Sequence, residues 1–204
     1  MPLRVYGVVI QDGQGPLKLP DGVRLHPLRD LAALVEDADY GSREAAEADI
    51  EKHLRVIETV FGQDAVLPSP VGTVFRSPEV LQRWMELHYV ALSDALAWIE
   101  NRVAARVHVL RGPDADAARD SNSDLTAIAG EVARSLRRRA VASVPLRHEE
   151  DSATLMSSAF LVEEELWREF EEAVTDERER HPTLQVQVTG PWPPYDFVRL
   201  QFGS

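Results

Sequence analysis

Alternating apolar and polar residues predict most of the strands of this chain. Residues 184–189 follow the period-two pattern of a half-buried strand, with leucine and valine on one face and glutamine and threonine on the other. Residues 102–111 show the same period, with valine and alanine opposite arginine and histidine. Shorter apolar runs bounded by Gly and Pro predict further strands at residues 5–10, 23–35 and 155–162.

Four stretches carry the helical period instead, each with one apolar stripe that we expect to be buried. The second has the clearest start, because Ser77 can cap it, Pro78 suits its first turn and Glu79 suits the positive end of the helix dipole. The predicted stripes are Ala46, Ile50, Leu54, Ile57 and Phe61; Leu81, Trp84, Met85, His88, Leu92, Ala95 and Ile99; Leu125, Ile128, Ala129, Val132 and Leu136; and Leu166, Phe170, Ala173 and Val174.

The order of these elements predicts an α+β protein of two small domains, residues 1–100 and residues 101–204. Strand, helix, strand, helix and strand over residues 102–189 suit a ferredoxin-like layer, provided that one more short strand lies near residues 142–146. The second domain is then followed by an extended tail over residues 190–204 that is rich in proline and aromatic residues.

The start of this tail is the most unusual stretch of the chain. Glycine breaks the strand pattern, and three prolines fix φ and remove backbone donors, so that the segment should leave the sheet and present its aromatic side chains from an extended backbone. These side chains either pack over the protein's own core or form a docking surface for a partner. The residues concerned are Gly190, Pro191, Trp192, Pro193, Pro194, Tyr195 and Phe197.

Composition narrows the classes of function. The chain has 204 residues with 34 acidic and 22 basic side chains, and a net charge of −12 argues against a general nucleic-acid binder. The absence of cysteine excludes disulfides, thiolate catalysis and zinc–thiolate sites. No apolar run has the length of a signal peptide core or a transmembrane helix, so we expect a cytoplasmic protein that does not enter the membrane.

Candidate chemistry is sparse. The six histidines are scattered without metal-ligand spacing, and we expect no catalytic residue, cofactor or metal. Residues 148–151 are the densest group of potential ligands, and residues 13–15 resemble a phosphate loop only in having two glycines. Arg137, Arg138 and Arg139 suit the negative end of a helix dipole. Arg76, just before the second helix, either holds two elements together or contacts a partner.

Four motifs resemble the gas vesicle protein F/L family. The sequence from Thr189 to Val198 is similar to the carboxyl-terminal signature of that family, and residues 5–9, 66–75 and 158–163 resemble its opening strand, its central Leu-Pro stretch and the strand before its last helix. The motifs also occur in the family's order and spacing. The resemblance implies two α+β domains, the second ferredoxin-like, which agrees with the period analysis.

The resemblance also implies a function. We expect a non-catalytic accessory or minor structural protein of gas vesicle assembly, located at the gas vesicle and in the cytoplasm, which binds the apolar major shell subunit and other gas vesicle accessory proteins. The tail segment and the stripe of the second helix are the surfaces that we expect to contact such partners. The fold alone would also permit a ferredoxin-like module that binds a ligand or regulates another protein.

Overall fold

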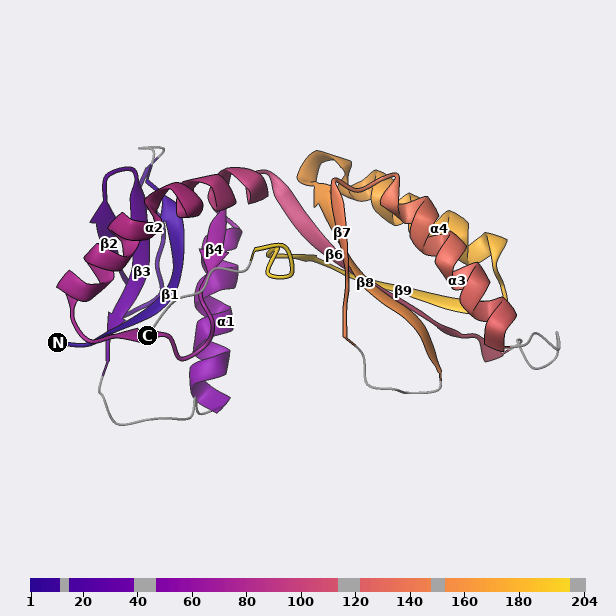
Figure 1. Ribbon diagram of the computed structural model, residues 1–204, viewed down its shortest axis with the longest axis horizontal. Coiled ribbons are helices and arrows are strands. Elements are labelled where there is room, and N and C mark those ends of the chain that lie inside the picture. Colours follow the sequence, from indigo (N-terminus) through magenta and orange to yellow (C-terminus); the bar gives the residue numbers. More distant parts are fainter. Residues whose placement is uncertain (12–14, 39–46, 114–121, 148–152, 199–204) are drawn as a thin grey trace. The chain divides into compact units, whose positions relative to one another are not determined.

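The computed structural model describes residues 1–11, 15–38, 47–113, 122–147 and 153–198, and they form two compact units (Figure 1). The amino-terminal unit takes residues 1–100 together with Val198, and the carboxyl-terminal unit takes Asn101–Phe197. None of the helices in the described ranges is both long and apolar enough to cross a membrane.

The amino-terminal unit is built on an antiparallel sheet with the strand order β2-β3-β1-β4, and β5 pairs with a further part of β1. A bulge between Val5 and Gly7 in β1 shifts the register of that strand against β3. The strands are β1 (Leu3–Ile10), β2 (Arg24–Leu28), β3 (Leu31–Asp37), β4 (Val66–Pro68) and β5 (Val74–Phe75).

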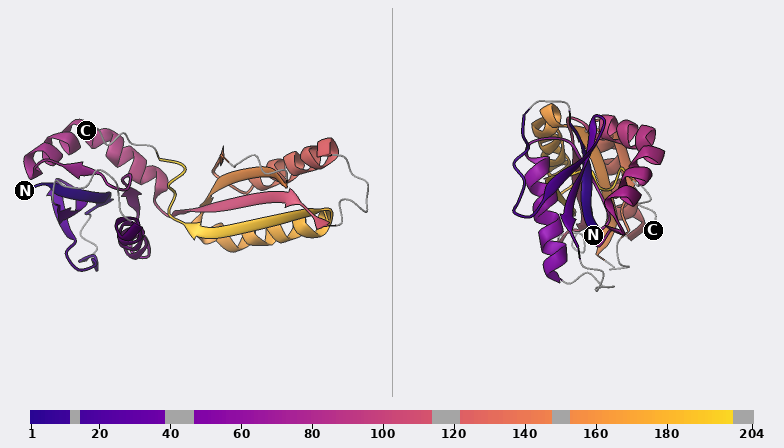
Figure 2. Two further views of the ribbon diagram at one scale, coloured as in Figure 1. Left: turned by 90° about the horizontal axis from the view of Figure 1, so that it is seen from below. Right: turned by 90° about the vertical axis from the view of Figure 1, so that its left-hand side faces the viewer.

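Helices α1 (Glu47–Phe61) and α2 (Pro78–Ile99) cover opposite faces of this sheet (Figures 1 and 2). The start of α2 is as predicted, since the Ser77 Oγ accepts a hydrogen bond from the Val80 backbone N–H. Its predicted stripe is also confirmed as an inner face, because five of the seven side chains are buried and Ala95 packs on the same core. The expectation that this stripe contacts a partner is therefore wrong, because its side chains are already covered by the sheet.

The predicted stripe of α1 is wrong at Ile50 and Leu54 and confirmed at Ile57, while Ala46 lies outside the described residues. Ile50 and Leu54 are 42% and 43% exposed, whereas His53, Val56, Ile57 and Val60 are buried. Positions 53, 56, 57 and 60 also have helical spacing, and of these the predicted stripe contained only Ile57. The ring of His53 packs on that of Tyr6, with 5.5 Å between centroids.

The carboxyl-terminal unit confirms the ferredoxin-like prediction. Strands β6 (Arg102–Arg111), β7 (Ala142–Pro145), β8 (Thr154–Glu163) and β9 (Leu184–Trp192) form an antiparallel sheet in the order β7-β8-β6-β9. Helices α3 (Asn122–Arg137) and α4 (Trp167–Arg180) lie side by side on one face of it, and a short 3₁₀ turn, η2 (Glu164–Leu166), precedes α4 (Figures 1 and 2).

The side chains of β6 that face the helices are the predicted apolar set, and Phe160 of β8 packs on Phe170 of α4 with ring centroids 5.6 Å apart. One predicted core residue differs: Leu166 is 39% exposed. It lies in η2, and the tighter winding of a 3₁₀ turn takes it off the stripe that a continuous α-helix would have formed.

Candidate partner-binding surface

Strand β9 continues into the tail further than the sequence predicts. It ends at Trp192, which pairs with Ala104 of β6 after an irregularity in register between Ala104 and Arg106. The prediction that Gly190 ends the sheet ladder is therefore wrong. Because β9 is an edge strand and the irregularity leaves Gly190 and Pro191 without a paired residue on β6, Pro191 can be included although it has no N–H to donate.

Gly190 is required at this bend by its surroundings. Its φ of +137° lies in the region that side-chain-bearing residues rarely adopt, and its peptide bond to Pro191 is cis. A Cβ atom at this position would lie 2.7 Å from the Ala104 carbonyl oxygen and 2.9 Å from the ring of Trp167. The bend thus depends on close approach of the backbone of β9 to β6 and α4.

Beyond the bend, the described part of the tail divides into buried and exposed side chains, and residues 199–204 of the predicted tail lie outside the described residues. Pro193 and Pro194 are buried and Tyr195 and Phe197 are half-buried, whereas Trp192 is 41% exposed. The backbone folds into a turn in which the N–H of Tyr195 donates to the carbonyl of Pro193 at 2.8 Å. The indole N–H of Trp192 donates to the Thr189 hydroxyl at 3.2 Å. Trp192 therefore offers the largest free surface of the segment.

An ion pair fastens the turn to the sheet. The Arg106 guanidinium, on the face of β6 away from the helices, donates to both carboxylate oxygens of Asp196 at 3.0 and 3.4 Å. After this turn, the side chain of Val198 packs on the core of the amino-terminal unit. The chain therefore leaves the carboxyl-terminal unit between Phe197 and Val198.

The structure does not gather all of the predicted site residues into one unit. Arg76 is exposed between β5 and α2 of the amino-terminal unit, while residues 190–197 belong to the carboxyl-terminal unit. The neighbour of Arg76, Phe75, is buried and packs on Trp84 of α2 with ring centroids 5.6 Å apart. The join between β5 and α2 is thus held by this aromatic pair.

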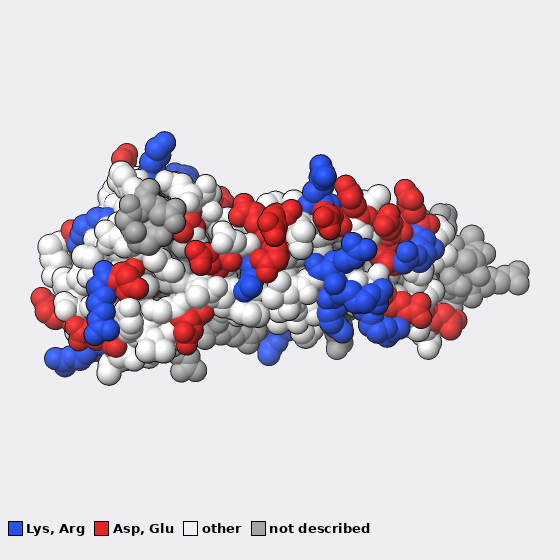
Figure 3. Space-filling model, turned by 90° about the horizontal axis from the view of Figure 1, so that it is seen from above, with Lys and Arg blue, Asp and Glu red and all other residues white. Residues whose placement is uncertain are grey.

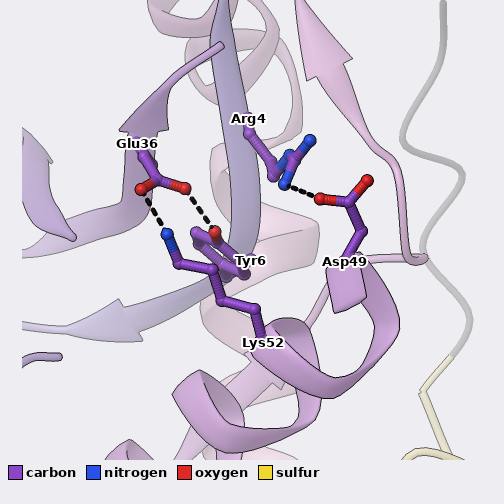
Figure 4. Close-up of polar contacts among 5 residues, drawn as sticks. All are labelled: Arg4, Tyr6, Glu36, Asp49 and Lys52. Atoms are coloured by element: carbon purple, nitrogen blue, oxygen red, sulfur yellow. Dashed lines mark hydrogen bonds and ion pairs between the residues drawn. The ribbon is translucent and has the colours of Figure 1, made fainter. Parts of the chain in front are cut away.

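A polar cluster that no sequence pattern predicts lies between α1 and the sheet (Figure 4). The Tyr6 hydroxyl donates to Glu36 Oε2 at 2.7 Å, and the Lys52 ammonium binds the other oxygen of the same carboxylate. The Arg4 guanidinium donates to Asp49 at 2.5 Å. The Arg4–Asp49 pair joins β1 directly to α1. Glu36 of β3 joins the same two elements through Tyr6 of β1 and Lys52 of α1. Only the fold reveals them, because their partners are far apart in the sequence.

Burial and partners shift the pKa values in this cluster. Burial raises the pKa of the Tyr6 phenol, and its hydrogen bond to Glu36 raises it further. Burial alone would raise the pKa of Glu36, but the hydrogen bonds from Lys52 and Tyr6 outweigh that effect and lower it. Burial also lowers the pKa of His53 nearby. The cluster thus has a stabilising arrangement, with an ionised carboxylate, a protonated phenol and a neutral imidazole.

The other predicted chemistry is structural where the structure describes it. The Arg138 guanidinium donates to the carbonyl of Arg134 in the last turn of α3, which fits the helix-end interpretation, and Arg137 donates to the Ser143 hydroxyl of β7 at 2.9 Å. Figure 3 shows basic side chains gathered over the helical layer of this unit beside acidic ones. Residues 148–151 and most of the 13–15 stretch lie outside the described residues.

Hollows open on the described part of the carboxyl-terminal unit. One, of about 270 Å³, lies between the end of α3 and the start of α4 and is lined by Val141, Leu166, Phe170 and four charged side chains together with Ala140. Another, of about 500 Å³, is lined by Asn101 and the three glutamates from Glu163 to Glu165. In the described ranges, no group of three or more His, Asp or Glu side chains is placed to hold a metal ion.

Comparison with known proteins gives a consistent result along the chain. The family model of the gas vesicle synthesis protein GvpL/GvpF matches residues 3–124 and 114–199. Gas vesicle protein F2 of Halobacterium salinarum is 29% identical over 214 residues, which cover 99% of this chain and 94% of that protein. Gas vesicle protein F of Haloferax mediterranei is 28% identical over 213 residues, which cover 99% and 95% of the two chains.

Two crystal structures share the fold. The gas vesicle protein GvpF from Anabaena matches with a TM-score of 0.80 at 18% identity, covering 98% of this chain and 97% of that one. GvpF from Microcystis aeruginosa matches with a TM-score of 0.75 at 17% identity, covering 98% and 99%. The two-unit α+β architecture described above is therefore that of solved GvpF structures.

Proposed function

This chain belongs to the gas vesicle synthesis protein GvpL/GvpF family, and from that premise we propose that it is a non-catalytic accessory or minor structural protein of gas vesicle assembly. It acts by binding other gas vesicle proteins, above all the apolar major shell subunit. The observation that carries this proposal is the family match, which extends through both structural units.

The surface of the protein fits such a role. An apolar shell subunit exposes surface that aggregates in water until it is assembled. A partner with a net charge of −12 keeps such complexes apart by like-charge repulsion, while its own exposed apolar side chains make the contact. Trp192, with its rigid backbone and exposed ring, is one such side chain on the carboxyl-terminal unit.

Co-expression with the major shell protein tests the proposal. We expect the tagged chain to capture the shell protein, and Trp192→Ala to reduce the captured amount while folding is retained. Val141→Ala is the matched control, because Val141 is an exposed apolar residue of the same unit, 39% exposed against 41% for Trp192. A well-folded wild-type chain that captures no shell protein would contradict the proposed partner.

Fractionation of cells into washed vesicles and soluble protein distinguishes a minor structural component from an assembly factor. Chain that remains in washed, purified vesicles would identify a minor structural component. Chain found only in the soluble fraction would identify an assembly factor.

A further inference from the structure

Helix α2 carries a second apolar stripe on the side that faces solvent. Val80, Leu87 and Trp98 are 47%, 77% and 42% exposed, and Ala91 between them is exposed as well. Their spacings of seven, four and seven residues place them in one row along the helix, as in the seam of a coiled coil. Val90 lies beside this row and is 68% exposed. We call these five residues the outer stripe.

The outer stripe is not needed for the unit's own core. A different face of α2 already fills that core with residues such as Leu81, Met85 and Leu92, which are fully buried. A surface helix of a globular protein ordinarily has one apolar stripe and a polar outer face. From Val80 to Trp98 the outer stripe extends over about 27 Å at 1.5 Å per residue. It therefore matches a partner helix of about five turns.

The charges on and beside the outer stripe specify its partner. Asp94 lies in the row itself, between Ala91 and Trp98, and is exposed without an ion pair to any residue that the structure describes. Glu79 and Glu86 are exposed on the same side of α2, with Arg83 as the basic exception. A second copy of this acidic chain would bring like charges together, whereas a basic helix would pair with them.

We propose that the outer stripe of α2 is a docking surface for an amphipathic helix of a partner protein, with an apolar face flanked by lysine or arginine. The partner's apolar row packs beside Leu87 and Trp98 in the manner of a two-helix coiled coil, and one of its basic residues pairs with Asp94. This inference rests on the proposed function, because it names the surface and the chemistry through which the chain would bind an assembly partner.

Synthetic helices of defined charge test the inference without any gas vesicle protein. One labelled 22-residue peptide has a leucine and alanine seam with lysine and arginine flanks; its counterpart has glutamate at every flank. Fluorescence anisotropy with the full chain measures binding of each. We expect the basic peptide to bind and the acidic peptide to bind at least tenfold more weakly.

Two variants then locate the binding. Leu87→Asp should weaken binding of the basic peptide at least tenfold, and because the Leu87 side chain is 77% exposed, the fold should persist. Asp94→Lys should shift the preference towards the acidic peptide. Val71→Asp, at an exposed apolar position of the same unit outside α2, is the control and should leave binding unchanged. Circular dichroism melts confirm that each variant is folded.

The inference is overturned if the folded wild type binds neither peptide or binds both equally, or if Leu87→Asp binds as the wild type does. These results are separate from the test of the proposed function. Capture of the shell protein that persists in Leu87→Asp would retain the proposed function and place the contact elsewhere. Selective binding of the basic peptide without capture of the shell protein would retain the docking surface and remove the proposed shell partner.

Discussion

At the scale of single residues, backbone geometry at Gly190 decides whether the tail can form. Gly190→Ala should destabilise the carboxyl-terminal unit by about 1–3 kcal/mol, because the Cβ would meet the Ala104 carbonyl and the positive φ is strained for alanine. Urea unfolding followed by tryptophan fluorescence and circular dichroism measures this change.

Gly130→Ala is the matched control, since Gly130 lies inside α3 and the nearest atom to its added Cβ is the end of the Arg134 side chain at 3.7 Å. Alanine should stabilise that helix by about 0.5–1 kcal/mol. Equal effects of the two substitutions would mean that Gly190 is not constrained in solution.

His53 makes the stability of the amino-terminal unit depend on pH. Burial lowers its pKa below the ordinary 6.5, and the nearby Arg4 guanidinium lowers it further, so that the unfolded chain takes up a proton before the folded chain does. Stability is therefore complete above about pH 7 and falls as the pH drops through 6.5 towards the folded pKa. Glu36, with a lowered carboxylate pKa, adds its own loss only at more acidic pH, below about 4.5.

His53→Gln should flatten this dependence. The readout is the difference in unfolding free energy between pH 7.5 and pH 5.5, which we expect to be smaller in the variant than in the wild type. Leu54→Gln, at a half-exposed position of the same helix, alters no titrating group and should keep the wild-type difference. An unchanged difference in His53→Gln would rule out the neutral buried imidazole.

At the scale of elements, the contact of α1 with its sheet depends on polar as well as apolar groups. Tyr6→Phe removes the hydrogen bond to Glu36 and should destabilise the amino-terminal unit by about 1–2 kcal/mol, because the lost bond involves a charged acceptor. Asp37→Asn is the comparison: its ion pair with Arg24 is half-exposed, and its loss should change stability by less than about 1 kcal/mol. Thermal and urea unfolding of both variants measures the contrast.

The sequence predicted those elements whose period was simple. Strand β6 and the inner stripe of α2 were predicted correctly because each apolar set follows one period over many residues. The predicted buried face of α1 was wrong because apolar residues occur at two sets of helical positions. Packing against the sheet, which the sequence does not show, selects the set that includes His53. The predicted end of β9 was wrong because an edge strand with an irregular register tolerates a proline that a central strand would not tolerate.

The candidate site was harder to predict than the fold. The aromatic tail was identifiable from its composition, but which of its rings are covered is seen only in the folded chain, where Tyr195 and Phe197 are half-buried and Trp192 is exposed. The outer stripe of α2 follows the same helical period as the inner one, so the period alone could not show which of the two is buried. The Tyr6–Glu36–Lys52 contacts depend on residues brought together by the sheet, which no local pattern contains.

At the scale of the whole molecule, the first and the last described residues of the chain belong to the same unit. After Phe197 it returns to the amino-terminal unit, where Val198 packs on a core formed by β1, β3 and α2. Because Val198 is half-buried there, Val198→Asp introduces a charge beside apolar side chains and should destabilise that unit by about 1–2 kcal/mol. The strands β6 and β8 of the other unit should be unaffected.

Native-state hydrogen exchange separates the two units in one experiment. Protection of the amides of β1 and β3 should fall in Val198→Asp, while that of β6 and β8 remains at the wild-type level. Val71→Asp adds the same charge at a site of the amino-terminal unit that is 40% exposed, and it should leave both sets protected. Reduced protection in β6 and β8 alone would show that Val198 supports the carboxyl-terminal unit instead. The expected pattern would make Val198, the last described residue, part of the core of the amino-terminal unit. A tag that takes the place of Val198 directly after Phe197 would then destabilise the unit that carries the outer stripe.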